Sequence, residues 1–500
     1  MSGGRAVSSP HVDFLVEFFV LCLLGLVAAL AMALVAHLDT VRNADRRFTD
    51  LLMSNRARET MMEPPAGAPR FVYIDIGEET CNKWALHQGT SCTLGLLPFR
   101  EQVSELIKEL AARSKAQSTR PKLVVIDVGL APAPTALGKD GSDADAHLCE
   151  RLLDLAKYES VIAVRPIIIK ADQIQAYPSI LHQDSNIAAC SRSARMPNLW
   201  FGSPLLLADP DGVIRSVHAW DTFRDWKTDA AERTAGIAWL ASALLNGNDP
   251  QLLACLFAGS KPEDIASAAE RCDNNTVKLG AVSERVASLS HFRADRIAFN
   301  LPYVKPGAPN PGSYGYAPSL LDVVEAYDFN SKSPNFVHGA IVIVGSSFPT
   351  SGDLHPTPLE RDMPGAIVHA NGIRSYASGL VKEKHDWVLE TSLIGVAAAI
   401  NAFFYVMGVL LARRWNALAG DFVRIVTSAL GIVVAAFIVL IIGFLWAFGE
   451  LARSGAALGV LTPVAVVVLE GFFNILHELR RIAHYIVRRM GYGLSADEAL

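Results

Sequence analysis

Long uncharged apolar segments stand near both ends of the sequence and predict membrane-spanning helices. The first, FFVLCLLGLVAALAMALVA at residues 18–36, is about the length that crosses a ~30 Å hydrocarbon core. The four predicted spans are residues 14–38, 388–411, 425–449 and 455–474. A cleaved signal peptide is the alternative for the first segment, but that segment is long for one and no small-x-small cleavage site follows it.

Arginines between the spans predict their orientation. The loop between the second and third spans holds more arginines than the next loop: Arg413, Arg414 and Arg424 against Arg453. Short loops rich in Lys and Arg stay in the cytoplasm. The predicted cytoplasmic parts are residues 1–13, 412–424 and 475–500. Three arginines after the first span oppose this assignment, but long domains translocate largely regardless of such charges.

Residues 40–387 are therefore predicted to form a periplasmic or extracellular domain, held by four helices in the inner membrane of a bacterial-type cell and in contact with its lipids. In this domain, β-branched and aromatic runs predict strands at 70–76, 122–129 and 160–169. Apolar residues at helical spacing predict helices at 99–114 and 142–158. Such alternation favours parallel βαβ units, so the expected fold is α/β with a mainly parallel or mixed sheet.

The pattern is less regular after this alternation. The segment SPLLLADPDGVIRSVHAW, residues 203–220, predicts two strands around a turn at Asp209–Gly212. Residues 232–247 predict a helix, and residues 259–290 read as a disulfide-tied insertion. IVIVG at 341–345 is a buried-type strand, and a helix is expected from Gly365.

The loop between that last strand and helix stands where α/β proteins often hold phosphate. A phosphate loop requires G-x-x-x-x-G-K-[ST], since backbone amides cradle the phosphates while the Lys neutralises them. Here Gly345 and Gly352 are too widely spaced, and Asp353 occupies the position that needs the Lys. The G-x-G-x-x-G fingerprint is missing as well. Nucleotide binding by this loop is not expected.

Six of the seven cysteines lie in the predicted outer domain, and only Cys22 lies in a span. The six are Cys81, Cys92, Cys149, Cys190, Cys255 and Cys272. An oxidising compartment favours their pairing. Proximity in sequence favours Cys81–Cys92 and Cys255–Cys272, which leaves Cys149–Cys190; buried free thiols are the alternative.

Acidic residues follow three of the strands, and they form the candidate site. Asp75 and Asp127 close the first two strands, and Asp353 follows the strand at 341–345. Ligands bind beyond the carboxyl ends of parallel strands. These carboxylates, with Arg100, are the predicted ligand-binding residues, for a divalent cation, an amine or, at Arg100, an anion. The alternative is a structural role, in which they accept loop amides and pair with Arg100.

Other chemistry is weakly supported. His355 and His369 with Asp353 would make a two-His-one-carboxylate metal set, although a hydrogen-bonded core histidine is the more ordinary reading. A hydrolase using Ser346, His369 and Asp353 lacks the G-x-S-x-G elbow, so no enzyme is expected. A net charge of −5 without a basic patch disfavours nucleic acid. The sequence indicates no cofactor.

Several segments together resemble one known family, the type 2 CHASE domain (cyclase/histidine-kinase-associated sensory extracellular). They are YIDIGEET (73–80), PFR (98–100), VVIDVG (124–129), ADPDGVIRSV (208–217), FNLPY (299–303) and MPGAIVHAN (363–371). The chain departs from the family where Ile76 and Gly77 follow Asp75, since a second acidic residue is usual there, and where Phe99 replaces a frequent Trp.

The resemblance implies a membrane-anchored sensor that passes its state through the helices to a cytoplasmic kinase or cyclase. We expect a homodimer or oligomer, because displacement between paired helices transmits a signal simply. Only residues 475–500 follow the last span, with Ile475, Leu479, Ile482 and Ile486 spaced as in a coiled coil. The output is expected from a separate partner or from a longer form of this chain. The alternative hypothesis is an envelope docking protein that binds a protein partner without sensing.

Overall fold

The computed structural model describes most of residues 69–383, together with Asp50, Met407, Val426 and Thr427. The gaps within 69–383 are residues 89–91, 93–98, 132–137, 171–172, 177–197, 207, 226–230, 249–251, 254–275, 280–281, 286–293, 298, 300, 304, 306–319 and 379–381. None of the helices in the described part has the length and apolarity that crossing a membrane requires. Apart from three of the isolated residues, the four predicted spans lie outside the described residues.

A six-stranded sheet forms the centre of the domain, and each of its neighbouring strand pairs is parallel. Its strands are β1 (Phe71–Ile76), β2 (Leu123–Ile126), β3 (Val161–Val164), β6 (Leu199–Gly202), β13 (Leu321–Glu325) and β14 (Ile341–Ser346). Their order is β13-β1-β14-β2-β3-β6. β1, β2, β3 and β14 are buried along their whole length, as expected of strands covered on both faces. The predicted α/β class with a mainly parallel sheet is confirmed.

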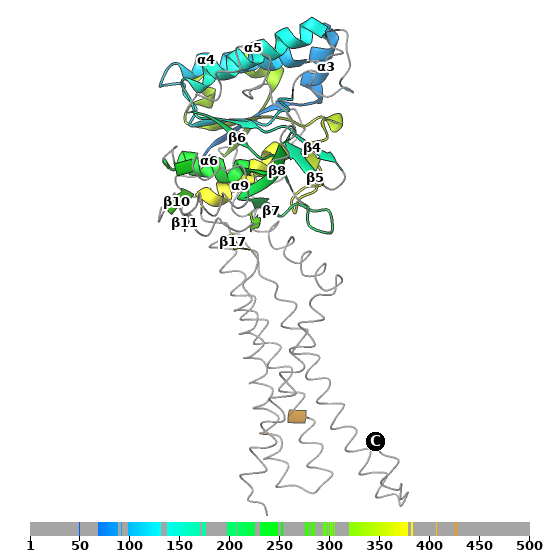
Figure 1. Ribbon diagram of the computed structural model, residues 1–500, viewed down its shortest axis with the longest axis vertical. Helices are drawn as coiled ribbons and strands as arrows, with labels where there is room; N and C mark the ends of the chain where they lie inside the picture. Colours follow the sequence, from blue (N-terminus) through cyan, green and yellow to red (C-terminus); the bar gives the residue numbers. More distant parts are fainter. Residues whose placement is uncertain are drawn as a thin grey trace, which may run out of the picture. The chain divides into compact units, whose positions relative to one another are not determined.

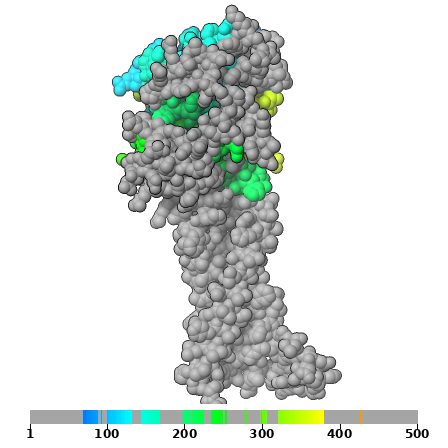
Figure 2. Space-filling view, viewed as in Figure 1, coloured from blue at the N-terminus to red at the C-terminus, as the bar shows by residue number. Residues whose placement is uncertain are grey.

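Helices cover both faces of this sheet (Figure 1). One face carries α3 (Glu78–Gln88), α4 (Arg100–Ser114) and α5 (Gly138–Ala156), and the other carries α6 (Ile237–Leu245) and α9 (Gly365–Ala377). The predicted helices at 99–114, at 142–158 and from Gly365 are thus confirmed, although α5 begins earlier. The outward side of α4 and α5, in cyan, is exposed in the space-filling view (Figure 2).

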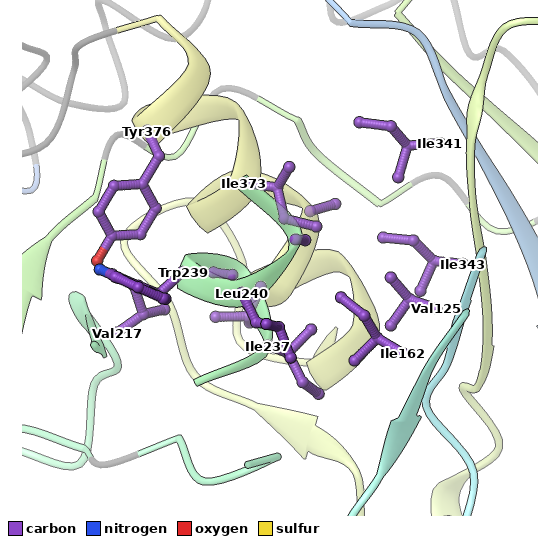
Figure 3. Packing of buried hydrophobic residues seen from close by; sticks show 14 of the residues in the cluster. Val125, Ile162, Val217, Ile237, Trp239, Leu240, Ile341, Ile343, Ile373 and Tyr376 are labelled. Carbon is purple, nitrogen blue, oxygen red and sulfur yellow. The ribbon is translucent and has the colours of Figure 1, made fainter. Parts of the chain in front are cut away.

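The alternation of side chains along β1 separates two apolar cores. Val72 and Ile74 pack in the cluster with α3, α4 and α5, whereas Phe71 and Tyr73 pack in the cluster with α6 and α9. Figure 3 shows the second cluster, to which Trp239 and Ile373 from the helices and Ile343 from the sheet belong. α9 is buried from Gly365 to Tyr376, so its position is fixed by packing along nearly its whole length.

A smaller sheet, β4-β5-β8-β9, corrects two sequence predictions. Its strands are β4 (Ile167–Lys170), β5 (Gln173–Ala176), β8 (Trp220–Asp225) and β9 (Ala231–Ala235). The single strand predicted at 160–169 is two strands in different sheets, because Pro166 has no N–H for a ladder. The helix predicted at 232–247 begins only at Ile237, because the preceding residues pair with β8.

The prediction of two paired strands at 203–220 is wrong, although the predicted turn at Asp209–Gly212 is present. Asp209 donates its backbone N–H to the Val213 carbonyl at 2.9 Å, and Gly212 has the positive φ of 81° that such a turn favours. The strand after it, β7 (Ser216–His218), pairs instead with β12 (Ala294–Arg296). The remaining elements are β10 (Thr276–Leu279), β11 (Val282–Arg285), β15 (Leu354–His355), β16 (Met363–Pro364) and the 3₁₀ turns η7 (Ala326–Ser331), η8 (Pro334–Val337) and η9 (Pro349–Ser351).

β7 and β12 belong to a three-stranded sheet, β17-β12-β7, that also includes β17 (Lys382–Glu383); we call it the junction sheet. The C-terminal end of α9 is tied to it, since the Tyr376 hydroxyl donates to Asp295 Oδ2 at 2.7 Å. Arg215, next to β7, pairs with three carboxylates, those of Asp50, Asp209 and Asp211, at 2.6, 3.1 and 2.8 Å.

Candidate functional site

The connections around β14 leave the sheet on opposite faces and create the place where an open parallel sheet usually binds ligands. β1 leads into α3 and α4, β2 leads into α5, and β14 between them leads into α9 on the other face. Ligands bind at the carboxyl ends of strands where such a reversal occurs. The predicted residues Asp75 and Asp127 lie at this edge, at one level on either side of Gly345.

The pleat directs these side chains to the α9 face. Tyr73 and Val125 face α9, so Asp75 and Asp127, two residues further along, point the same way. Gly345 between them has no side chain, and a Cβ there would come within 2.6 Å of Ala366 Cβ on α9. The glycine therefore allows the first turn of α9 to approach the sheet between the two carboxylates.

Asp75 is fully buried and holds two hydroxyl groups. Its Oδ2 accepts hydrogen bonds from Tyr303 Oη at 2.7 Å and Ser347 Oγ at 2.8 Å. Its Oδ1 has no hydrogen-bond partner of good geometry among the described residues, although the nearby Tyr73 hydroxyl also favours the ionised carboxylate. Burial raises the pKa of Asp75 to about 6, against the lowering effect of the two hydroxyl groups. Sequence reasoning missed Tyr303 and Ser347.

Asp127 and Asp353 interact with each other. The Asp127 Oδ2 is shielded from solvent and has no partner among the described residues. Burial, together with the charge of Asp353, raises the pKa of Asp127 well above its usual range. Asp353 lies against the N-terminus of α9, where a Cβ on Gly365 would be 2.3 Å from its Oδ1. Burial also raises the pKa of Asp353, while His355, whose Nε2 is 3.3 Å from Oδ1, lowers it.

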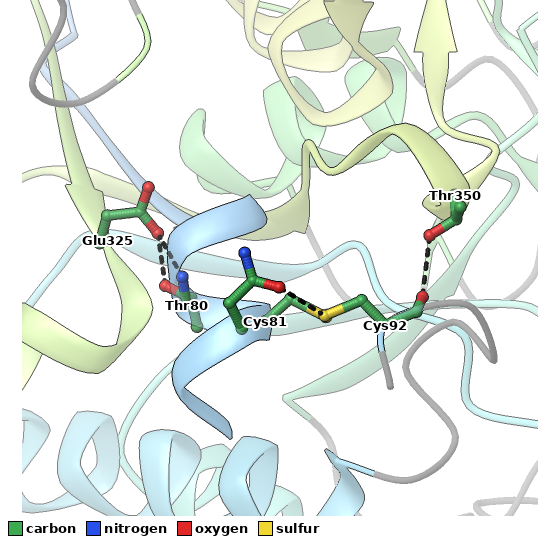
Figure 4. The surroundings of a disulfide bond; sticks show 6 residues. Thr80, Cys81, Cys92, Glu325 and Thr350 are labelled. Carbon is green, nitrogen blue, oxygen red and sulfur yellow. Dashed lines mark hydrogen bonds between the residues drawn. A yellow bond between two sulfur atoms is a disulfide. The ribbon is translucent and has the colours of Figure 1, made fainter. Parts of the chain in front are cut away.

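Glu325, at the end of β13, holds the N-terminus of α3. It accepts hydrogen bonds from the Thr80 backbone N–H at 3.3 Å and from the Thr80 hydroxyl (Figure 4). Helix N-termini attract anions, and here Glu325 accepts the Thr80 N–H of α3, while the Gly365 N–H at the start of α9 donates to the Asp353 backbone carbonyl at 2.9 Å.

The segment 301–303 is fastened to α9 by one side chain. Asn371 Oδ1 accepts the Leu301 N–H at 2.8 Å, and Asn371 Nδ2 donates to the carbonyl oxygens of Leu301 and Ile367, each at 2.9 Å. This places the Tyr303 ring edge-on to Tyr73, with centroids 6.1 Å apart, and brings its hydroxyl to Asp75. Described residues of the segments FNLPY, MPGAIVHAN and YIDIGEET thus meet at one place.

Two further buried polar atoms face this region. The Tyr73 hydroxyl and His369 Nδ1 have no hydrogen-bond partner of good geometry among the described residues. Burial lowers the pKa of His369 to about 3, so its imidazole is neutral. Within the described part of the chain, no three His, Cys, Asp or Glu side chains are grouped so that they could hold a metal ion. His355, His369 and Asp353 therefore do not form a preassembled metal set.

The side chain of Arg100 is bonded to residues outside the group of Asp75, Asp127 and Asp353. Its Nη1 lies 2.7 Å from Asp145 Oδ1 on α5, and its Nη2 donates to the Ala131 carbonyl. Both charged side chains are about 5% exposed, so the pair is a buried brace between α4, α5 and the loop after β2. The charge of Asp353 acts on Asp127, and Asp75 lies on the same face of the sheet, whereas Arg100 has its own partner.

The cysteine prediction is confirmed where it falls on described residues. Cys81 and Cys92 form a disulfide with a Cα–Cα distance of 5.9 Å (Figure 4). Thr350 donates its hydroxyl to the Cys92 carbonyl at 2.8 Å, which ties the loop after β14 to this bridge. Cys149 is also disulfide-bonded. Cys190, Cys255 and Cys272 lie outside the described residues.

Comparison with known proteins bears on this arrangement. The model of the CHASE2 domain family matches residues 25–411. No curated protein and no solved structure matches the chain. The matched range includes all the residues that build the site, from β1 to α9. It spans well over half of the sequence, and the chain therefore belongs to the CHASE2 domain family, a family of sensory extracellular domains.

Proposed function

We propose that this protein is a membrane-anchored extracytoplasmic sensor of the bacterial inner membrane. Its outer domain detects a small molecule, an ion or an envelope partner, and the four predicted helices relay the state of the domain to a cytoplasmic output. The observation that carries the proposal is the path of α9. Its first residue contacts Asp353 at the site, and its Tyr376 is bonded to Asp295 in the junction sheet.

α9 is suited to transmit a displacement. It is buried against the sheet along nearly its whole length, and thirteen residues span about 20 Å at 1.5 Å each. Close-packed interiors do not absorb a shift locally, so movement at one end of a buried helix is passed to the other. A change at the carboxylate edge would therefore reach β12.

The junction sheet stands next to the segments that lead to the predicted spans. β17 pairs with β12 and ends at Glu383, shortly before the predicted span 388–411. Arg215, beside β7, binds Asp50, which follows the predicted span 14–38. Asp50 and β17, each close in sequence to one of the first two predicted spans, are thus attached to this sheet or to Arg215 beside it, and this supports the proposal that the two spans move together.

The output is proposed to be a kinase or cyclase, supplied by a partner or by a longer form of the chain, in a homodimer or larger oligomer. The test is affinity purification of the tagged protein from native membranes, with mass spectrometry of the proteins that accompany it. Recovery of a kinase or a cyclase supports the sensor. Recovery of envelope proteins alone, or of this protein alone, contradicts it.

Coupling is tested separately with Tyr376→Phe, which removes only the hydroxyl that binds Asp295. Hydrogen exchange is followed in β12 and β17 of the full chain, with and without the site substitution Ser347→Ala. We expect Ser347→Ala to change exchange in these strands, and Tyr376→Phe to abolish that change. Equal exchange in the presence and absence of Ser347→Ala contradicts the α9 path.

One observation favours the alternative function of docking an envelope protein. A groove of about 580 Å³ lies between α3, α4 and η7, and Leu86 on its rim is 84% exposed. Lys83 and His87 are on its α3 wall, and Glu101 and Glu105 are on its α4 wall. Such a groove suits a partner peptide with one apolar residue between charges of both signs. If docking is the function, Leu86→Asp removes the envelope proteins recovered in the purification.

A further inference from the structure

We infer that the groove between α3, α4 and η7 receives α3 of a second copy of this chain, and that two outer domains meet there about a two-fold axis. The inference rests on the proposed homodimeric sensor and gives its outer domain a contact surface. It does not depend on which output protein follows.

The α3 side of this groove carries both an apolar projection and an apolar recess. Leu86 is 84% exposed, and it is the only exposed large apolar side chain in the described part of residues 69–383. A single exposed Leu is ordinary on a protein surface. Leu86, however, lines a groove of about 580 Å³ together with Trp84, Leu106 and Ala326. These three are 8%, 4% and 6% exposed, so they form an apolar floor beside the projecting leucine.

The charges on the two walls of the groove have opposite signs. Lys83 and His87 on the α3 wall are four residues apart, with Leu86 between them in sequence, so the three share one face of the helix. Glu101 and Glu105 on the α4 wall are also four residues apart, and both are exposed. One wall therefore presents an apolar residue with two basic-type residues, and the other wall presents two carboxylates.

The charged residues of the walls can exchange their present partners at little cost. Three of them form ion pairs within the chain at 2.6–3.2 Å, and these pairs are Lys83–Glu79, Glu105–Lys108 and Glu101–His147. In each pair both side chains are between 41% and 57% exposed. Exposed ion pairs contribute little to stability, so pairs between two copies can replace them.

A second copy of the chain satisfies both walls at once. In a two-fold contact the same patch of each copy faces the other, so every contact forms twice. Leu86 of one copy then enters the apolar floor of the other. Lys83 and His87 lie opposite the acidic α4 wall of the other copy. An acidic peptide would match the α3 wall alone, and a basic peptide would match the α4 wall alone.

The contact is connected to the carboxyl edge of the central sheet. Glu325 at the end of β13 accepts hydrogen bonds from the backbone N–H and the hydroxyl of Thr80 in the first turn of α3 (Figure 4). Lys83, one turn further along α3, has its Nζ 3.2 Å from the centroid of the Tyr327 ring on η7. A shift at the end of β13 therefore changes the position of α3 and η7, which form two sides of the groove.

The experiment maps the contact by photo-crosslinking in the full chain. A photoreactive phenylalanine analogue is introduced at position 86, where the exposure of Leu86 lets the fold accept it. Copies with normal and heavy nitrogen are mixed in detergent, reconstituted into lipid nanodiscs and irradiated, and the joined peptides are identified by mass spectrometry. We expect position 86 of one isotope to be joined to α4 or η7 of the other. The same analogue in place of Glu150, on the exposed side of α5, is the matched control and should give no mixed pair.

A charge exchange tests the orientation of the two copies. Glu105→Lys places a positive charge opposite Lys83 of the other copy, so the yield of mixed pairs should fall about fivefold, and adding Lys83→Glu to the same chain should restore it. An unchanged yield in Glu105→Lys overturns the two-fold contact.

The crosslinks themselves give two further results that overturn the inference. One is the absence of mixed pairs from position 86, and the other is a set of mixed pairs that join it to elements other than α4 and η7. In native membranes, crosslinks from position 86 to a different envelope protein alone also overturn it. These results are the same whether or not a kinase or cyclase accompanies the protein, so failure of this contact is distinct from failure of the proposed sensor.

Discussion

The hydrogen bonds of the Asn371 side-chain amide are expected to be the main contacts that hold segment 301–303, which includes Tyr303, against α9. The substitution Asn371→Ala tests this. The substitution removes the partners of the Leu301 N–H and carbonyl, in a position where Leu301 is 1% exposed. Each buried backbone group left unpaired costs about 1–3 kcal/mol, so the two together cost about 2–6 kcal/mol. The Ile367 carbonyl loses less, because an α-helical carbonyl also accepts a backbone N–H.

The measurement is thermal unfolding of the full chain in nanodiscs, followed by tryptophan fluorescence. At roughly 2 °C per kcal/mol for a domain of this size, Tm should fall by about 4–12 °C. Asn335→Ala is the matched control, since Asn335 is exposed on η8 and its recorded bonds use only its backbone carbonyl. A fall of less than about 2 °C, or an equal fall in the control, would refute the reasoning.

Three further predictions concern single contacts. The pKa of Asp75 is about 6 in the folded protein, above its usual 3.8, so the folded state binds the proton of this carboxyl group more tightly than the unfolded chain does. The free energy of unfolding should therefore rise by up to about 3 kcal/mol as pH falls from 7 towards 4. Asp75→Asn should flatten this rise in a Tm–pH profile; an unchanged profile contradicts the assignment. Asp50→Asn and Arg215→Gln should show a coupling free energy of about 1–3 kcal/mol in a double-mutant cycle, because the Arg215 side chain is only 1% exposed. If the two losses of unfolding free energy simply add, the contact does not stabilise the fold. Replacing Cys81 and Cys92 by Ser should cost about 2–3 kcal/mol, given their sequence separation of 11, and should remove the effect of reductant on the unfolding of this region.

Sequence patterns located the central elements because those patterns are local. The apolar runs of β1, β2 and β14 and the helical spacing of α4 describe how each segment is buried, and each was found in its predicted place. The rule that ligand residues follow parallel strands selected Asp75, Asp127 and Asp353 for the same reason.

The partners of these residues could not be found in this way. Tyr303 bonds to Asp75 across a separation of 228 residues, and Glu325 ends a strand that is defined by pairing with β1. Such contacts are tertiary and leave no local periodicity. The prediction of a helix from residue 232 was wrong for a related reason. Pairing with β8 overrides the local preference of residues 232–235.

The position of β14 has a consequence for the order in which this protein can fold. β14 begins at Ile341, yet it lies between β1 and β2, whose residues are made more than 200 positions earlier. Until that segment has been synthesised, β1 and β2 lack their common neighbour and expose strand edges that favour wrong pairing. Long-range parallel pairing is also slow. The newly made chain therefore depends on protection of its first half, and a chain that stops before β14 should be recovered as aggregate rather than as a smaller folded domain.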